Sequence, residues 1–215
     1  MAYTIDPDRL DQINGKTLGK GHHGSLEQGV CVMEAVAYIS GGFWTDSPYC
    51  ACPVLGAFLR SWNDTLPDDK RQEFLKPLIP RLVGTKSTPT VEQRRAIMAA
   101  DWMIRVHTPT WLRLAGLIDQ ANVLEAMPEI TDFAACPSLL PTLQAVRRDA
   151  SAAEAAAWAA ARDAAWAAAR DAAWAAAWAA ARDAAGAAAE AALAPTVAAL
   201  QLSALDLVNR MIDAE

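Results

Sequence analysis

An alanine-rich tract over residues 152–194 constrains the fold more than any other feature, because 29 of its 43 residues are alanine. Alanine is the strongest helix former, so the tract predicts a helix. Large residues recur every four positions, as in Trp158, Arg162 and Trp166. A spacing of four drifts by about 40° per step around a helix, so this row winds around the axis. Each arginine is expected to stack on the tryptophan four residues away.

This helix is predicted to begin near Ser138 and, if unbroken to Ala194, to be roughly 85 Å long at 1.5 Å per residue. It is poor in large aliphatic side chains, so we expect it to pair through its alanine surfaces, with a homo-oligomer through residues 152–194 as one outcome. The alternative is a repeat expansion that only stays helical and soluble. Pro195 is expected to end or kink the helix.

The fold class is predicted to be all-α, because no stretch alternates polar and apolar residues between turn signals. Four parts are expected: an irregular arm over 1–24, a helical core domain over 25–137, the long helix over 138–194, and a C-terminal helix over 195–215. The last segment is amphipathic, so we expect it to fold back onto the domain or to oligomerise.

Charge and apolar patterning restrict the partners and the compartment. The formal net charge is −6, which argues against nucleic acid as a partner. The first twelve residues are charged and lack the apolar segment of a secretory signal. Arg–Asp pairs interrupt the alanine tract, so no apolar run is expected to reach membrane length. These features predict a cytoplasmic protein with reduced thiols that does not bind membranes.

Candidate chemistry concentrates in residues 22–64, which hold three of the four cysteines and two of the three histidines. Ser25 followed by Gln28 predicts a capping box and a helix that runs to about Ile39. Positions i, i+4, i+7 and i+11 share one face of such a helix. The residues at these positions are Glu27, Cys31, Glu34 and Tyr38.

Glu34 lies beside apolar neighbours, so its carboxylate must be paired or have a raised pKa. Cys31 near a helix N-terminus lies in a field that favours the thiolate. One interpretation is a ligand-binding pocket. Its predicted lining comprises His23, Glu27, Cys31, Glu34, Tyr38, Trp44, Asp46 and Arg60. The alternative is structural, with Cys31 in the core and Glu34 paired with an arginine such as Arg60 or Arg105.

Other chemistries fit the residues less well. The glycines around Lys16 lack the spacing of a phosphate-binding loop, which leaves a basic arm that could hold a small anion. The set His22, His23, Cys50 and Cys52 matches no standard zinc spacing. A cysteine hydrolase with Cys31 as nucleophile usually takes its histidine from a sheet, and no strand is predicted.

The sequence therefore favours a non-catalytic protein that binds a small ligand or partner between its first helices, with no catalytic residue, metal or cofactor expected. A small anion is the candidate ligand. Two alternatives stay open: a structural protein that works through the alanine-rich rod, and a cysteine-dependent hydrolase.

A block of residues within this region also carries a resemblance. The block reads His23-x-x-x-Glu27-x-x-x-Cys31-x-Met33-Glu34-Ala35-Val36-Ala37, then Asp46-x-Pro48-x-Cys50-x-x-Pro53, Asn63-Asp64 and Val83-Gly84-Thr85. Over most of its length the chain resembles an uncharacterised group of proteins from actinobacteria and their phages, which often end in variable tracts of ARDAA and AWAAA units. The resemblance implies a cytoplasmic protein and implies no activity, ligand or fold.

Overall fold

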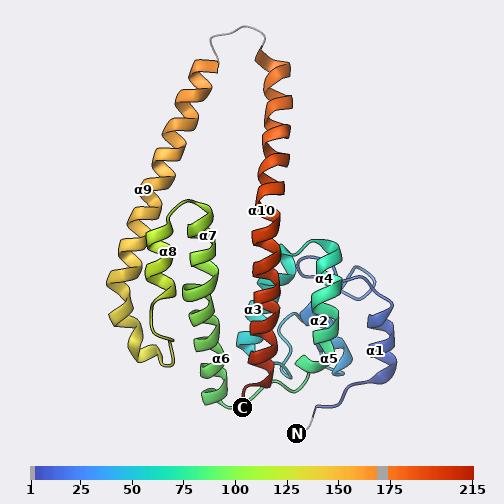
Figure 1. Ribbon diagram of the computed structural model, residues 1–215. Coiled ribbons are helices and arrows are strands. Elements are labelled where there is room, and N and C mark those ends of the chain that lie inside the picture. The colour runs from blue at the N-terminus through green and yellow to red at the C-terminus, as the bar shows by residue number, and fades with distance from the viewer. Residues whose placement is uncertain (1–2, 169–173) are drawn as a thin grey trace. The chain divides into compact units, whose positions relative to one another are not determined.

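A computed structural model describes residues 3–168 and 174–215 (Figure 1), without the side chains of 135–136, 157–158 and 160–188. Within these ranges the regular elements are helices and there is no strand, which confirms the predicted all-α class. The chain divides into two compact units. The N-terminal unit comprises Met1–Ala99 and Leu205–Glu215, and the second unit comprises Ala100–Ala204.

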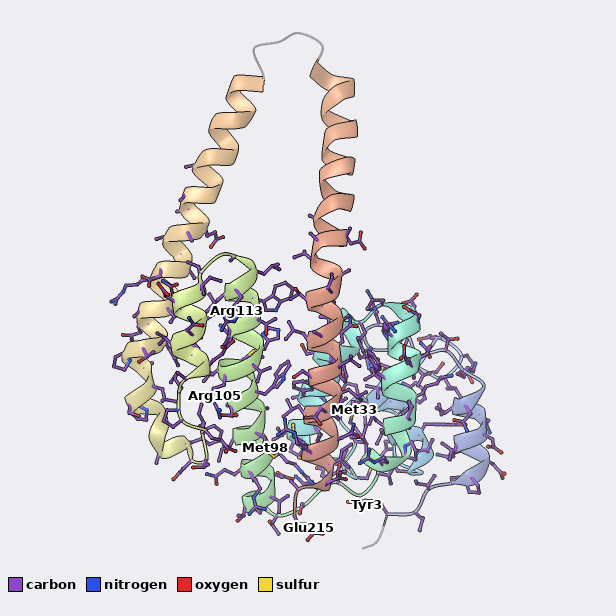
Figure 2. All side chains as sticks on the ribbon, viewed as in Figure 1. Tyr3, Met33, Met98, Arg105, Arg113 and Glu215 are labelled. Atoms are coloured by element: carbon purple, nitrogen blue, oxygen red, sulfur yellow. The ribbon has the colours of Figure 1, made fainter. Side chains whose placement is uncertain are left out.

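The N-terminal unit is built around α2. Its elements are α1 (Pro7–Asn14), α2 (Val32–Ile39), α3 (Pro53–Thr65), α4 (Asp68–Leu75), the 3₁₀ turn Lys76–Leu78, α5 (Ile79–Leu82), most of α6 (Pro89–Trp102) and the end of α10 (Trp174–Asp213). Seven of the eight residues of α2 are buried, including Met33, which Figure 2 labels. Helices α1, α3 and α5 pack against α2, so its short apolar sequence forms the centre of the core.

The last residues of α10 belong to this unit. Leu207, Val208 and Met211 have no exposed surface. The Arg95 guanidinium donates from Nε to the Met211 carbonyl at 2.6 Å and from Nη1 to the Thr85 carbonyl at 2.6 Å. A cation at the C-terminal carbonyls of a helix is stabilising, because it satisfies acceptors that have no partner within the helix. Pairing of this helix with another chain stays a prediction.

In the second unit α6 continues through a π-helical turn, Met103–His107, into α7 (Thr108–Leu114), and is followed by α8 (Ile118–Glu125), the 3₁₀ turn Phe133–Ala135 and α9 (Cys136–Ala168). A small core joins α7, α8 and α9, formed by Leu112, Ala121, Leu124 and Val146. Arg113, labelled in Figure 2, bonds to Glu125 and links α7 to α8.

Two predicted boundaries are wrong. The arm over 1–24 contains α1, which begins after Asp6, whose carboxylate accepts hydrogen bonds from the first turn. The helix expected from Ser25 begins only at Val32, because Gly29 has φ +142°, a conformation that a helix cannot contain. Ser25 instead opens a turn in which the Gln28 N–H donates to the Ser25 carbonyl.

The alanine-rich tract is helical in α9 and α10. The sequence predicts that Pro195 ends or kinks the helix. The predicted end is wrong, because α10 runs through Pro195 to Asp213, and the kink stays a prediction. The predicted stacking of arginine on tryptophan, from Trp158 to Arg182, lies outside the described side chains. The predicted single helix over 138–194 would have to include residues 169–173, which lie outside the described residues, so its continuity stays a prediction.

The expectation that no apolar run reaches membrane length is also wrong. Among the described residues one helical segment, Ala189–Asp213, is long and apolar enough to cross a membrane. Core helices of soluble proteins pass the same test. Part of this segment is such a core helix, because residues 205–213 pack within the N-terminal unit.

Candidate functional site

Glu34 organises the first of two neighbouring features. It occupies the third position of α2, and Cys31 is the N-cap. Its carboxylate, fully buried, accepts from the Cys31 N–H at 2.8 Å and from the His23 N–H at 2.6 Å. It also accepts from Nδ1 of His23 at 2.8 Å. Nδ1 of His22 lies 2.9 Å from the carboxylate as an ion-pair contact. Hydrogen bonds within the protein therefore engage both carboxylate oxygens.

These donors decide the charge of Glu34. Desolvation, the largest single influence, raises the pKa of Glu34, but the hydrogen bonds from His23 and Cys31 together lower it below the ordinary value. The prediction of a paired carboxylate is confirmed. The predicted arginine partner is wrong, because the partners are His22 and His23.

Cys31 does not have the predicted thiolate character. Its side chain is almost fully buried. Desolvation raises the pKa of Cys31 to about 12, and the neighbouring Glu34 carboxylate adds to this rise. Backbone N–H groups at the start of α2 act in the opposite direction and are outweighed. The thiol is therefore protonated at neutral pH.

His23 is held on several sides. A Cβ at Gly29 would lie 2.3 Å from Cδ2 of the ring, so only glycine fits there. Trp44 donates from Nε1 to the His23 carbonyl at 2.7 Å, and its ring meets Tyr38 edge-to-face at 6.1 Å. Five of the eight predicted site residues are thus connected through hydrogen bonds and one ring contact on and beside α2. We call this group the Glu34 cluster: His23, Cys31, Glu34, Tyr38 and Trp44.

The other predicted residues lie elsewhere. Arg60 donates from Nη1 to the Asp46 carbonyl at 2.9 Å and to Ser47 Oγ at 3.1 Å, and its Nε lies 3.9 Å from the Asp46 carboxylate. The spacing of four residues in α3 also predicts a pair between Arg60 and Asp64. The structure does not show it among the described residues, and Asp64 accepts from the Gly21 N–H. Glu27 is exposed, and the Ser25 hydroxyl lowers its pKa. Among the described residues no hydrogen bond joins Glu27 to Glu34 or to Arg60.

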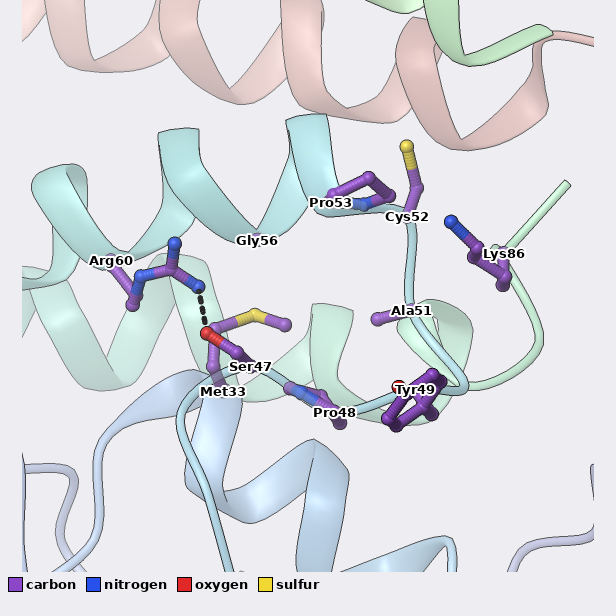
Figure 3. A pocket seen from close by; sticks show the side chains of 10 residues that line it. All are labelled: Met33, Ser47, Pro48, Tyr49, Ala51, Cys52, Pro53, Gly56, Arg60 and Lys86. Carbon is purple, nitrogen blue, oxygen red and sulfur yellow. Dashed lines mark hydrogen bonds between the residues drawn. The ribbon is translucent and has the colours of Figure 1, made fainter. Parts of the chain in front are cut away.

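Arg60 borders the second feature, a pocket of about 200 Å³. Figure 3 shows the residues that line it, which are Met33, Ser47, Pro48, Tyr49, Ala51, Cys52, Pro53, Gly56, Arg60 and Lys86. We call this the Arg60 pocket. It lies between α2, α3, the loop over residues 47–52 and the segment that carries Lys86. Two cationic side chains border a lining that is otherwise mostly apolar.

Most of these lining residues were not predicted from the sequence. Lys86 reaches the pocket because the Cys50 carbonyl accepts from the N–H groups of Gly84 and Lys86, at 2.9 and 3.2 Å. The Cys52 N–H also donates to Thr85 Oγ1 at 3.0 Å. These are long-range bonds without a sequence pattern. One sequence signal for the pocket was available, because Gly56 lies inside a segment with a clear helical pattern.

The two features limit what chemistry is available. Among the described residues no group of three or more histidine, cysteine, aspartate or glutamate side chains is arranged to hold a metal ion. Both oxygens of Glu34 are engaged and Cys31 is protonated. The Arg60 pocket, in contrast, is an open space bordered by two cationic side chains.

The second unit has a larger hollow of about 510 Å³ between α8 and α9. Asp119 and Asp149 are among its lining residues, and Gln120 donates to Asp149 at 3.0 Å. Its ionisable lining residues are acidic, so it would repel the anionic ligand that the sequence suggested.

Comparison of the chain with protein-family models, with curated proteins and with solved structures gives no match.

Proposed function

We propose that the N-terminal unit is a non-catalytic binding module for a small anionic ligand, held in the Arg60 pocket of a cytoplasmic protein. The observation that carries the proposal is the pair of cations, Arg60 and Lys86, on a small and otherwise mostly apolar pocket. Pockets of this kind gain affinity from apolar burial and orient the ligand through a few polar groups.

Arg60 keeps donor capacity for a ligand. Its Nη1 is bonded to the loop, which fixes the direction of the guanidinium. No hydrogen bond from Nη2 to another described residue is present. A guanidinium presents its N–H groups as a planar fork, which suits a carboxylate or phosphate.

Lys86 supplies the second positive charge. It forms an ion pair with Glu92 at 2.8 Å. This hydrogen bond raises the pKa of Lys86, so the ammonium stays charged at neutral pH. In Figure 3 Lys86 and Arg60 come from opposite sides of the pocket. An anion in the pocket lies within the field of both.

The pocket is preformed, which favours binding. The bonds of Cys50 and Cys52 to residues 84–86 fix one side of the loop, and Arg60 fixes the other. A rigid site loses little conformational entropy on binding.

Thermal unfolding with added anions tests this proposal. At a concentration of ten times Kd a ligand stabilises by about 1.4 kcal/mol, which corresponds to roughly 3–6 °C for a chain of this size. We expect sodium benzoate or phosphate, at constant ionic strength, to raise the unfolding midpoint, and benzylamine to leave it unchanged.

Two variants with the same change in charge separate the site from general electrostatics. Lys86→Gln should weaken the stabilisation by anions. Lys16→Gln removes an exposed cation outside the pocket and should leave it unchanged. Equal loss in both variants, or no stabilisation by any anion, would contradict the proposal.

A second proposal is self-association through α10. Most of the apolar window within Ala189–Asp213 is not buried, and Leu202 is 59 % exposed. An apolar helix surface of this extent is a common interface between copies of one chain. Light scattering should show an oligomer, and Leu202→Asp should dissociate it. A monomer at all concentrations would contradict this second proposal.

A further inference from the structure

Gly56 occupies a position in α3 that does not need glycine for its backbone. It is helical and does not have a positive φ. Glycine is among the poorest helix formers, because its backbone loses the most conformational freedom on folding. Another residue would therefore stabilise the helix.

Packing does not require glycine at this position either. A Cβ at Gly56 would lie 3.4 Å from Nη1 of Arg60 and 3.5 Å from Cε of Met33, both ordinary van der Waals distances. Gly29 differs, since a Cβ there would clash with His23 at 2.3 Å. Gly56 lines the Arg60 pocket, so a side chain at position 56 would extend into the space of that pocket.

The surfaces around this space suit a flat apolar group. The Met33 thioether lies next to Gly56, and Figure 3 shows Met33 and Ala51 among the residues that line the pocket. A thioether makes favourable contacts with aromatic rings, and a glycine backbone allows a ring to approach closely. Tyr49 is 91 % exposed on the rigid loop at this pocket and leaves its ring surface available.

The size of the pocket suits a small ligand. Its volume of about 200 Å³ gives room for a single six-membered ring with one carboxylate.

We infer that the ligand is a small aromatic carboxylate, with its ring over Gly56 and against Met33, and its carboxylate on Arg60. This inference rests on the proposed function, because it specifies the anion that the Arg60 pocket takes. Gly56 is then the residue that determines specificity for a planar ring.

Calorimetric titration of the full chain with three carboxylates tests the inference. Benzoate is planar, cyclohexanecarboxylate has the same charge and a similar size but is puckered, and acetate has no ring. We expect benzoate to bind at least about tenfold more tightly than either of the others. In Gly56→Ala the affinity for benzoate should fall at least about tenfold, because an added methyl group overfills the slot.

The Gly56→Ala variant should remain folded, with an unfolding midpoint raised by roughly 2–4 °C. A lost affinity with a raised midpoint separates an effect on the pocket from an effect on folding. Two exposed aromatic residues give a further matched pair. Tyr49→Ala should weaken benzoate binding, and Phe43→Ala, at a residue that is 94 % exposed and outside the pocket, should not.

The outcomes distinguish the two proposals. Equal affinities for benzoate and cyclohexanecarboxylate, or unchanged benzoate affinity in Gly56→Ala, overturn the aromatic inference and leave an anion pocket in place. Absence of binding by every carboxylate and by phosphate overturns the proposed function and the inference together.

Discussion

The Glu34 cluster and the Arg60 pocket lie on successive residues of the same helix, since Glu34 belongs to the first and Met33 to the second. The cluster contains reactive residue types, a buried carboxylate, a histidine and a thiol, yet both oxygens of Glu34 accept hydrogen bonds within the protein. The pocket contains few such groups but has space and a guanidinium nitrogen without a described partner. The residue types that are common in catalysis are therefore engaged with one another here, whereas the open space and the free donor belong to the neighbouring pocket.

The largest expected contrast concerns thiol reactivity. A pKa of about 12 for Cys31, against 9.0 for an ordinary thiol, lowers the thiolate fraction at pH 8 about a thousandfold. We expect Cys31 to react with iodoacetamide at least about a hundredfold more slowly than a free cysteine peptide, as measured by mass spectrometry of native protein. Urea-unfolded protein is the control, in which Cys31 should react at the ordinary rate. Rapid alkylation in the native state would restore the cysteine hydrolase as a hypothesis.

Removal of the Glu34 carboxylate should be the most destabilising change in the cluster. Glu34→Ala leaves buried N–H groups of His23 and Cys31 without acceptors, which costs roughly 3 kcal/mol of unfolding free energy. Urea unfolding followed by circular dichroism at 222 nm measures the loss. Glu27→Ala, at an exposed carboxylate of the same type, is the control and should change stability by less than about 0.5 kcal/mol. Similar values for the two variants would show that the cluster does not hold the fold.

Two glycines with positive φ provide a graded test of how His23 is packed. Gly21→Ala, at φ +74° with open space around the Cβ, should cost about 1 kcal/mol from backbone strain alone. Gly29→Ala adds a clash with the His23 ring and should cost at least about 2 kcal/mol. Urea midpoints of both variants give the difference. Equal losses would place the His23 ring away from Gly29.

The smallest effect in this series is the pH dependence of stability. The pKa of Glu34 in the folded state is below its ordinary value of 4.5. Its contribution to the free energy of unfolding is therefore fully present above the pKa of the unfolded state. That contribution is lost as the pH falls through the pKa of the folded state. We expect the unfolding midpoint to fall between pH 5 and pH 3, and the fall to be smaller in Glu34→Gln. Asp64 shares this direction, because the Gly21 N–H lowers its pKa. An identical fall in Glu34→Gln would assign the acid sensitivity to other carboxylates.

Part of the Glu34 cluster could be predicted from the sequence. Cys31 and Glu34 have the N-cap and third-position spacing of a capping box, but the Ser25–Gln28 pair has the same spacing and the commoner residue type. The signal that decides between them is Gly29, a residue suited to the positive φ that stops a helix from running through it. Asp6 before Pro7 likewise marked the start of α1 within the predicted arm.

By itself the sequence determined the all-α class, the helical nature of the alanine-rich tract in α9 and α10, and the requirement that Glu34 be either paired or have a raised pKa. These follow from local propensity and from the cost of burying an unpaired charge, which act within a few residues. Only the tertiary structure decided that the partners are histidines rather than arginines, and that the Cys31 thiol is protonated. It also placed Lys86 and Arg60 on the same pocket and residues 205–215 in the N-terminal unit. These outcomes depend on which distant segments exclude water from one another, and no local spacing encodes that.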